Sequence, residues 1–175
     1  MASTIPSSEE LAEAKAILEA SRDQLLAFCA GLSPADWAKS DGDSRWSIAQ
    51  ILDHLVIVER RSVALLENLT QGTPDPDWEA KTAAKDSILA RAAVVEQRIS
   101  APAAIHPGPA PDPVYLQRDF RAAREETLAL AARPGVPLKH FVRTHPAFGD
   151  VTALQNLRLL GYHTQRHLSQ MRGCL

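Results

Sequence analysis

Two histidines in the last part of the sequence have a spacing that suits metal binding. His163 and His167 are four residues apart in the segment Gly161-Tyr-His-Thr-Gln-Arg-His. In an α-helix, residues i and i+4 lie on one face with Cβ atoms roughly 5–6 Å apart, so two such imidazoles can hold one ion between them. Two ordinary hydrogen-bonded histidines give the same pattern. A metal site therefore needs a third ligand from another element.

The two histidines belong to a strongly predicted helix. Leucines recur at helical spacing from Leu154 to Leu168, and the pattern continues to a helix end near Arg172. Asp150 or Thr152 can cap its first turn. The histidines lie along the edge of the apolar face, so we expect them to point inward or to the rim of a cleft.

His54 is the candidate for the third ligand. It stands two turns into a predicted helix that opens with the capping box Ser47-Ile-Ala-Gln50 and runs to Thr70. A lone histidine on an amphipathic helix is more often a core residue than a ligand. Three neutral imidazoles from two facing helices would, however, leave a coordination position open, as in catalytic metal sites. Such ligands suit zinc, nickel, copper and iron alike.

The remaining segments predict an all-α bundle in a single domain over residues 1–175. Three more helices are expected over 7–30, 79–100 and 113–132, and the second of these could equally be a partly irregular surface segment. The stretch 101–113 contains five prolines, which suits an extended cover over the bundle, although such a run could also be a domain linker. We prefer the cover, because neither half has enough regular elements for a separate core. Residues 138–149 are expected to form a connector.

The composition excludes several classes of protein. Hydrophobic residues make up 45% and charged residues 23%, which is ordinary for a globular protein. A net charge of −2 gives no basic surface for nucleic acid. No apolar run approaches the roughly 20 residues that span a membrane. Two cysteines do not suggest a disulfide framework. We therefore expect a cytoplasmic protein.

Three motifs in register resemble one known family. They are Trp46-Ser-Ile-Ala-Gln-Ile-Leu-Asp-His54-Leu, His145-Pro-Ala-Phe-Gly149, and Gln155 followed by His163-Thr-Gln-Arg-His167-Leu-Ser-Gln170. With this order the sequence resembles the DinB-like superfamily, the DinB/YfiT group of metal-binding four-helix-bundle proteins. The resemblance implies that His54, His163 and His167 bind a divalent metal, commonly zinc or nickel. It also implies an up-down-down-up bundle whose second and third main helices are parallel, joined by a crossover over residues 71–112. Asn156 departs from the family pattern, because similar sequences often carry an aromatic residue there.

The resemblance also directs the functional prediction. Some members resemble metal-dependent thiol S-transferases, so a low-molecular-weight thiol and a small electrophile are the expected partners, and a homodimer the expected assembly. Two alternatives stay open: a non-catalytic, stress-related metal-binding module and a metal-dependent hydrolase. Thr164 follows His163 where zincin peptidases carry a glutamate base, which argues against that kind of hydrolysis.

Several polar residues are candidates for supporting roles by position only. Gln170, one turn beyond His167, could orient a ligand, and Arg166 could attract an anion. His140 and His145 are expected to stay outside the coordination sphere, and His145 to lie at the mouth of the pocket. The candidates for a general base are Asp53, Glu59, His145 and Asp150.

Overall fold

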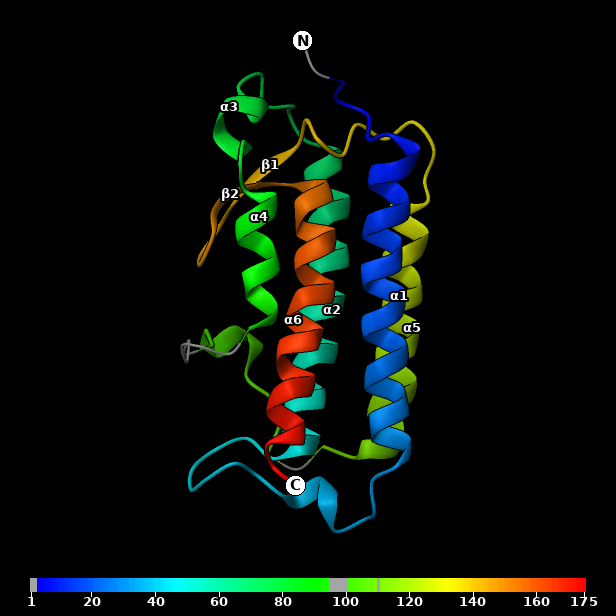
Figure 1. Cartoon of the computed structure of the whole chain (residues 1–175), viewed down its shortest axis with the longest axis vertical. Coiled ribbons are helices and arrows are strands. Elements are labelled where there is room, and N and C mark those ends of the chain that lie inside the picture. Colours follow the sequence, from blue (N-terminus) through cyan, green and yellow to red (C-terminus); the bar gives the residue numbers. More distant parts are fainter. Residues whose placement is uncertain (1–2, 95–100, 110) are drawn as a thin grey trace.

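Four long helices form the body of the protein (Figure 1). The structure is a computed structural model that describes residues 3–94, 101–109 and 111–175. The long helices are α1 (Ser8–Ala30), α2 (Ile48–Thr70), α5 (Pro113–Ala131) and α6 (Ala153–Arg172). The predicted four-helix bundle is confirmed.

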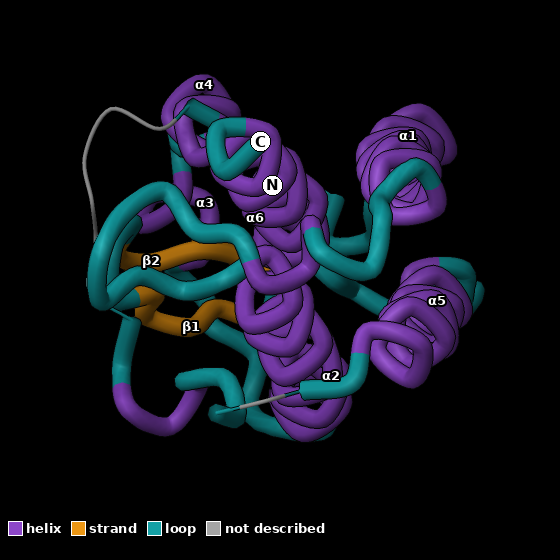
Figure 2. The backbone as a smooth tube through the Cα atoms, turned by 90° about the horizontal axis from the view of Figure 1, so that it is seen from below, coloured by secondary structure: helices purple, strands orange, loops and turns teal. Residues whose placement is uncertain are grey.

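The helices follow the up-down-down-up order. In Figure 1, α1 and α6 run from the top of the view to the bottom, and α2 and α5 run from the bottom to the top. Seen along the bundle in Figure 2, α1 lies beside α5 and α6, and α2 lies beside the same two helices. Because α2 and α5 run in the same direction, the segment between them must return along the whole length of the bundle. Residues 71–112 form this connection.

Local hydrogen bonds fix where three of these helices begin. Ser7 and Glu10 form the predicted capping box of α1, and Ser47 and Gln50 form that of α2. A third capping box joins Thr152 and Gln155, so Thr152 and not Asp150 is the N-cap of α6. Each box pairs two backbone N–H groups that would otherwise lack a partner at a helix start.

The crossover is less regular than a helix over residues 79–100. It contains α3 (Trp78–Thr82), α4 (Asp86–Leu89) and the 3₁₀ turn η2 (Ala90–Ala93). Ala84 has a φ of 58°, a left-handed conformation that ends any helix. Contacts with the body outweigh local helix propensity here, because Leu89 is fully buried in a cluster with Val151 and Leu159. Residues 95–100 of the predicted helix lie outside the described residues.

The connector before α6 contains a short hairpin that the sequence analysis did not predict. Strands β1 (Val142–His145) and β2 (Gly149–Thr152) pair antiparallel, and Gly149 adopts a φ of 66° at the start of β2. β2 leads straight into α6. The turn η3 (Ala103–Ile105) and the residues after it lie against α2, where Gln50 Nε2 donates to the Gly108 carbonyl oxygen and Asp53 accepts from the Gly108 N–H.

A buried polar layer divides the core of the bundle. One apolar cluster includes Leu52 and Phe120, and the other includes Leu18 and Leu157. Between them lies Arg124, which is 0% exposed and forms a two-bond ion pair with Glu59. All five guanidinium N–H groups have acceptors, which come from the other three long helices: Glu59 Oε1 and Oε2, the Leu18 carbonyl oxygen, Ser21 Oγ and Thr164 Oγ1. The layer therefore sets the relative register of the helices.

Helices α1 and α6 approach most closely at Gly161. A Cβ atom at this position would lie 2.5 Å from Ile17 Cγ2 and 3.1 Å from the Ile17 carbonyl oxygen. The helix backbone and the stiff β-branched side chain of Ile17 leave little room for adjustment. Glycine at this position therefore lets α1 and α6 approach closely, two residues before His163.

We expect Gly161→Ala to destabilise the protein by about 1–2 kcal/mol, because overpacking outweighs the gain of up to about 1 kcal/mol in helix propensity. Urea denaturation would measure this change. Gly173→Ala, at the C-cap of α6, is the comparison variant, because a Cβ there would meet only the α6 backbone, at 3.3 Å or more. An unchanged or higher stability of Gly161→Ala would contradict the tight approach.

Among the described residues, no helix is both long and apolar enough to cross a membrane.

Candidate metal centre

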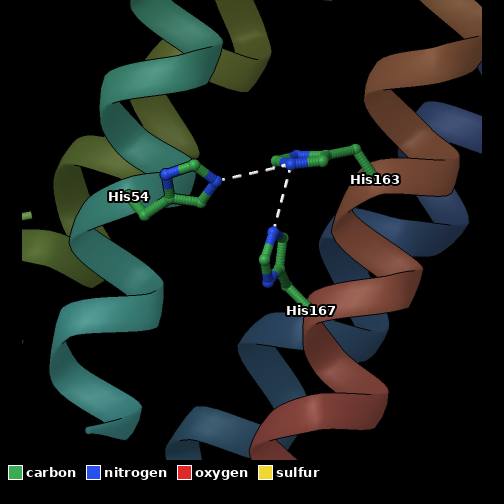
Figure 3. Close-up of side chains that lie close together, drawn as sticks. All are labelled: His54, His163 and His167. Atoms are coloured by element: carbon green, nitrogen blue, oxygen red, sulfur yellow. Dashed lines mark hydrogen bonds between the residues drawn. The ribbon is translucent and has the colours of Figure 1, made fainter. Parts of the chain in front are cut away.

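The three predicted histidines converge from two antiparallel helices. His54 projects from α2, and His163 and His167 project from α6 toward it (Figure 3). The Nε2 atom of His163 lies 3.4 Å from Nε2 of His54 and 3.1 Å from Nε2 of His167. One nitrogen from each of the three rings lies within 4.8 Å of the other two. The structure thus brings together residues that are 109 positions apart in the chain.

Hydrogen bonds on the far side of two rings leave their Nε2 lone pairs free for a cation. His54 Nδ1 donates to the Ile105 carbonyl oxygen at 2.8 Å, and His167 Nδ1 donates to Gln170 Oε1 at 3.0 Å. With the proton on Nδ1, each Nε2 is an acceptor. His163 Nε2 can donate to only one of them, so at least one buried lone pair at the centre lacks a proton.

The spacing of the nitrogens fits a metal site. In a tetrahedral site with metal–nitrogen bonds of about 2.0–2.1 Å, the ligand nitrogens are separated by about 3.3 Å. Two of the three separations, 3.1 and 3.4 Å, match this value, and the third is no more than 4.8 Å. Orienting hydrogen bonds to the second ring nitrogen are also typical of ligating histidines. The residues present therefore fit a divalent metal ion.

The surroundings keep the three imidazoles in the neutral form that can ligate. Desolvation by burial lowers the pKa of His54, lowers that of His163 well below its ordinary value, and lowers that of His167 to about 3. The neighbouring histidines act in the same direction on His163 and His167, since a charge on one ring disfavours a charge on the next. No ligand has to lose a proton before binding a metal near neutral pH.

A large pocket opens onto the three histidines. It has a volume of about 1400 Å³ and lies between α2 and α6, beneath the crossover and the β1–β2 hairpin. Its walls combine aliphatic and aromatic side chains with a few polar groups, as small-molecule sites do. The lining includes all three histidines, together with Trp46, Val58, Arg61, Arg143, His145, Phe148, Asn156, Leu160 and Gln170.

Comparison with known proteins supports what the motifs suggested. A family model of the DinB superfamily matches residues 17–171, which is most of the chain. The chain belongs to the DinB superfamily.

One relative is similar to this DinB protein in sequence, and two solved structures are similar to it in fold. The uncharacterized protein YuaE of Bacillus subtilis (strain 168) is 28% identical over 145 residues, covering 81% of this chain and 85% of YuaE. The solved structure of TT2238, a four-helix bundle protein, has a TM-score of 0.57 at 22% identity and covers 93% of this chain and 98% of its own. YfiT from Bacillus subtilis has a TM-score of 0.64 at 16% identity, covering 95% of this chain and 86% of its own. YfiT is described as "a probable metal-dependent hydrolase with an unusual four-helix bundle topology".

The three carboxylates that were candidates for a general base in this DinB protein all form hydrogen bonds elsewhere. Glu59 is bound to Arg124 and Thr127 in the polar layer, away from the pocket. Asp53 accepts the Gly108 N–H, and Asp150 accepts the Thr144 hydroxyl. No carboxylate joins the histidine cluster among the described residues. These three roles are structural.

Gln170, His145 and Arg166 are among the residues that line the pocket, and His140 is not. Gln170 orients His167 through a hydrogen bond to its Nδ1, in line with the role suggested for it. His145 lines the pocket outside the cluster, where its Nδ1 accepts the Ala147 N–H, and burial lowers its pKa to about 4. Arg166 also lines the pocket and donates to the Val94 carbonyl oxygen.

Sequence reasoning missed three contributors to the site. The Ile105 carbonyl oxygen fixes the tautomer of His54, and the Trp46 ring lies 4.9 Å from the His54 ring, centroid to centroid. Arg143 lines the same pocket from β1. A backbone carbonyl leaves no signal in residue types. Trp46 stands in the motif that carries the family resemblance, and its part in that motif was the one available signal.

Proposed function

We propose that His54, His163 and His167 bind one divalent metal ion, zinc or nickel, and that the protein is a metal-dependent thiol S-transferase. The observation that carries the proposal is the convergence of three neutral imidazoles at the wall of a large pocket. A structural zinc site would be closed by a fourth protein ligand, and the described residues supply only three. A three-histidine cluster that lines a large pocket favours an enzyme over a non-catalytic module.

Among the residues that the structure describes, no carboxylate joins the histidine cluster to act as a base, and this favours a thiol as the nucleophile. A metal held by the three histidines would act as a Lewis acid that lowers the pKa of a coordinating thiol. In the transfer, a carbon–sulfur bond forms and the bond from that carbon to its leaving group breaks. The leaving group departs with the electron pair, and the thiol proton passes to solvent. His54 and His167, fixed by Ile105 and Gln170, would keep the open position aimed into the pocket.

A hydrolase is the second candidate, and the description of YfiT favours it. Hydrolysis would need water in place of the thiol, and no carboxylate of the described ranges joins the cluster to accept its proton. A low-molecular-weight thiol with a small electrophile therefore remains our first proposal. The cytoplasmic location and the homodimer stay predictions.

The decisive test measures metal content and transfer together. Protein purified without an affinity tag should contain about one metal ion per chain by elemental analysis, consistent with one three-histidine site. With cysteine or coenzyme A as thiol and chlorodinitrobenzene as electrophile, the metal-loaded protein should catalyse thiol transfer faster than free metal does. His54→Ala should return the rate to background while the helical circular dichroism signal is kept.

Two results would decide against this proposal. A loaded wild-type protein with no rate above free metal, across a panel of thiols and electrophiles, would favour the binding module. Hydrolysis of an ester substrate that is lost in His54→Ala would favour the hydrolase.

His145→Gln should retain its metal to within error. His145 lies in the pocket but outside the cluster, and its Nδ1 is already engaged by the Ala147 N–H. Elemental analysis of this variant beside His167→Gln gives the comparison, since the second substitution should remove most of the metal. Loss of metal from both variants would place His145 in the coordination sphere.

A further inference from the structure

Two facing rows of side chains line the pocket in the same order. On α6 the row is Asn156, Leu160, His163 and His167, spaced by four, three and four residues. On α2 it is His54, Val58, Arg61 and Leu65, at the same kind of spacing. Since α2 and α6 run in opposite directions, the histidines of both rows share one end of the pocket. Moving along the pocket from this end, the next side chain on each helix is aliphatic. Beyond it lies a polar group, Arg61 on α2 and Asn156 on α6.

Arg143 lies at this polar end and has no anionic partner. Its Nη1 donates to Asn156 Oδ1 at 2.9 Å, and no other hydrogen bond joins its guanidinium to a residue that the structure describes. Within the same described ranges, no aspartate or glutamate forms an ion pair with it. Burial lowers the pKa of Arg143, because half-burying the cation removes water that would stabilise its charge. An anion in the pocket would restore that stabilisation.

Several other arginines have acidic partners among the described residues. Arg133 pairs with Glu67, Arg60 with Asp119, and Arg158 with both Glu13 and Asp86. Arg61 resembles Arg143 instead, because it lines the pocket and, within the described part of the chain, donates to a neutral group, the Ala104 carbonyl oxygen. The acidic residues of the pocket, Asp41 and Asp43, belong to the loop before α2, where Asp41 pairs with Arg45 at 3.6 Å.

Asn156 holds the arginine in place. Its side chain is 3% exposed and points its carbonyl oxygen to Arg143. Without this acceptor the guanidinium would lose the hydrogen bond that holds it against α6.

The distance along the helices sets the size of the ligand. Asn156 precedes His163 by seven residues, and at 1.5 Å per residue the two are separated by roughly 10 Å along α6. His54 and Arg61 have the same separation on α2. A ligand that reaches both ends must be elongated, with an apolar middle beside Val58 and Leu160.

We propose that Arg143, positioned by Asn156 and supported by Arg61, binds a carboxylate at the far end of the thiol substrate. The proposal rests on the function proposed above, because the thiol must reach the histidine end. A guanidinium matches a carboxylate with two parallel hydrogen bonds, and its Nε and Nη2 groups are available for them. The substrate class is thus a thiol that carries a carboxylate roughly 10 Å from its sulfur.

The test compares acids with their neutral amides. Zinc-loaded protein is titrated by calorimetry with ω-mercaptocarboxylic acids of increasing chain length and with the matching amides. Wild type should bind the acid at least about tenfold more tightly than the amide at the best length, as two charge-assisted hydrogen bonds allow. Arg143→Gln should lose this preference, Arg143→Lys should keep part of it, and Asn156→Leu should weaken it. Arg133→Gln, which alters an exposed arginine paired with Glu67, is the matched control and should change nothing.

Equal affinity for acid and amide at every length would overturn the carboxylate site, as would an acid preference that survives in Arg143→Gln. A second titration separates this failure from failure of the thiol-transfer proposal. Metal-free protein is titrated with hexanoate and hexanamide, which have no thiol. Binding of hexanoate alone, lost in Arg143→Gln, supports the site even if no thiol binds the metal-loaded protein. No binding of hexanoate overturns it.

Discussion

Replacing Arg124 with leucine should lower the free energy of unfolding by about 3–5 kcal/mol, the range for breaking one side of a buried ion pair. The substitution leaves the Glu59 carboxylate, which is 2% exposed, without its main partner between two apolar clusters. It also removes the hydrogen bonds that Arg124 donates to Ser21 Oγ, Thr164 Oγ1 and the Leu18 carbonyl oxygen. Urea denaturation followed by circular dichroism would measure the loss.

Two comparison variants show whether the loss comes from the unpaired carboxylate. The double variant Arg124→Leu, Glu59→Leu should recover a large part of the stability, because no charge is then left buried. Arg133→Leu, which breaks the exposed pair with Glu67, should cost less than about 1 kcal/mol. A double variant as unstable as the sum of the two single ones would show that the layer stabilises by packing and not by charge pairing.

Removal of the metal should destabilise the wild-type protein by about 4 kcal/mol when free metal exceeds Kd a thousandfold, because an ion that binds only the folded state shifts the unfolding equilibrium by that amount. Chelation should therefore lower the Tm of wild type. His163→Ala lacks a ligand from the centre of the cluster, so its Tm should not respond to the chelator.

His140→Ala is the control, since this histidine does not line the pocket, and its Tm should fall on chelation as that of wild type does. Equal shifts in wild type and His163→Ala would show that the chelator acts somewhere other than the three histidines.

Much of the bundle could be predicted because helix starts and apolar stripes are local signals. Ser7, Ser47 and Thr152 each stand three residues before a Glu or Gln, and each begins a helix in the structure. The crossover and the hairpin could not be predicted in the same way. Leu89 and Val151 owe their burial to α6, a contact between distant parts of the chain that neither segment encodes alone.

In the site, too, local signals could be predicted and contacts between distant segments could not. The three histidines were found from a helical spacing and a family motif, and the structure brings their Nε2 atoms together. Of the two groups that orient these histidines, only one could be predicted. Gln170 lies on the same helix as His167, whereas the Ile105 carbonyl oxygen contacts His54 from the crossover. Asn156 was noticed as a departure from the family, but its partner Arg143 lies on a strand that was not predicted.

The diagonal placement of consecutive helices affects how the chain can fold. In Figure 2, α2 stands diagonally across from α1, and α6 diagonally across from α5, so neither helix pair forms a large interface of its own. The main partner of α1 is α6, which is nearly the whole chain away in sequence. In a common antiparallel bundle, neighbouring helices can pair early as a hairpin at little cost in loop entropy.

This chain must close a long loop before α1 or α6 gains its largest contact. Folding rates fall as contacting residues become more distant in sequence, so refolding should be slow for an all-helical protein of this length. Until the last helix is available, the first one has much of its apolar face exposed to water. During synthesis on a ribosome, α1 would therefore remain without its main partner until α6 has been translated.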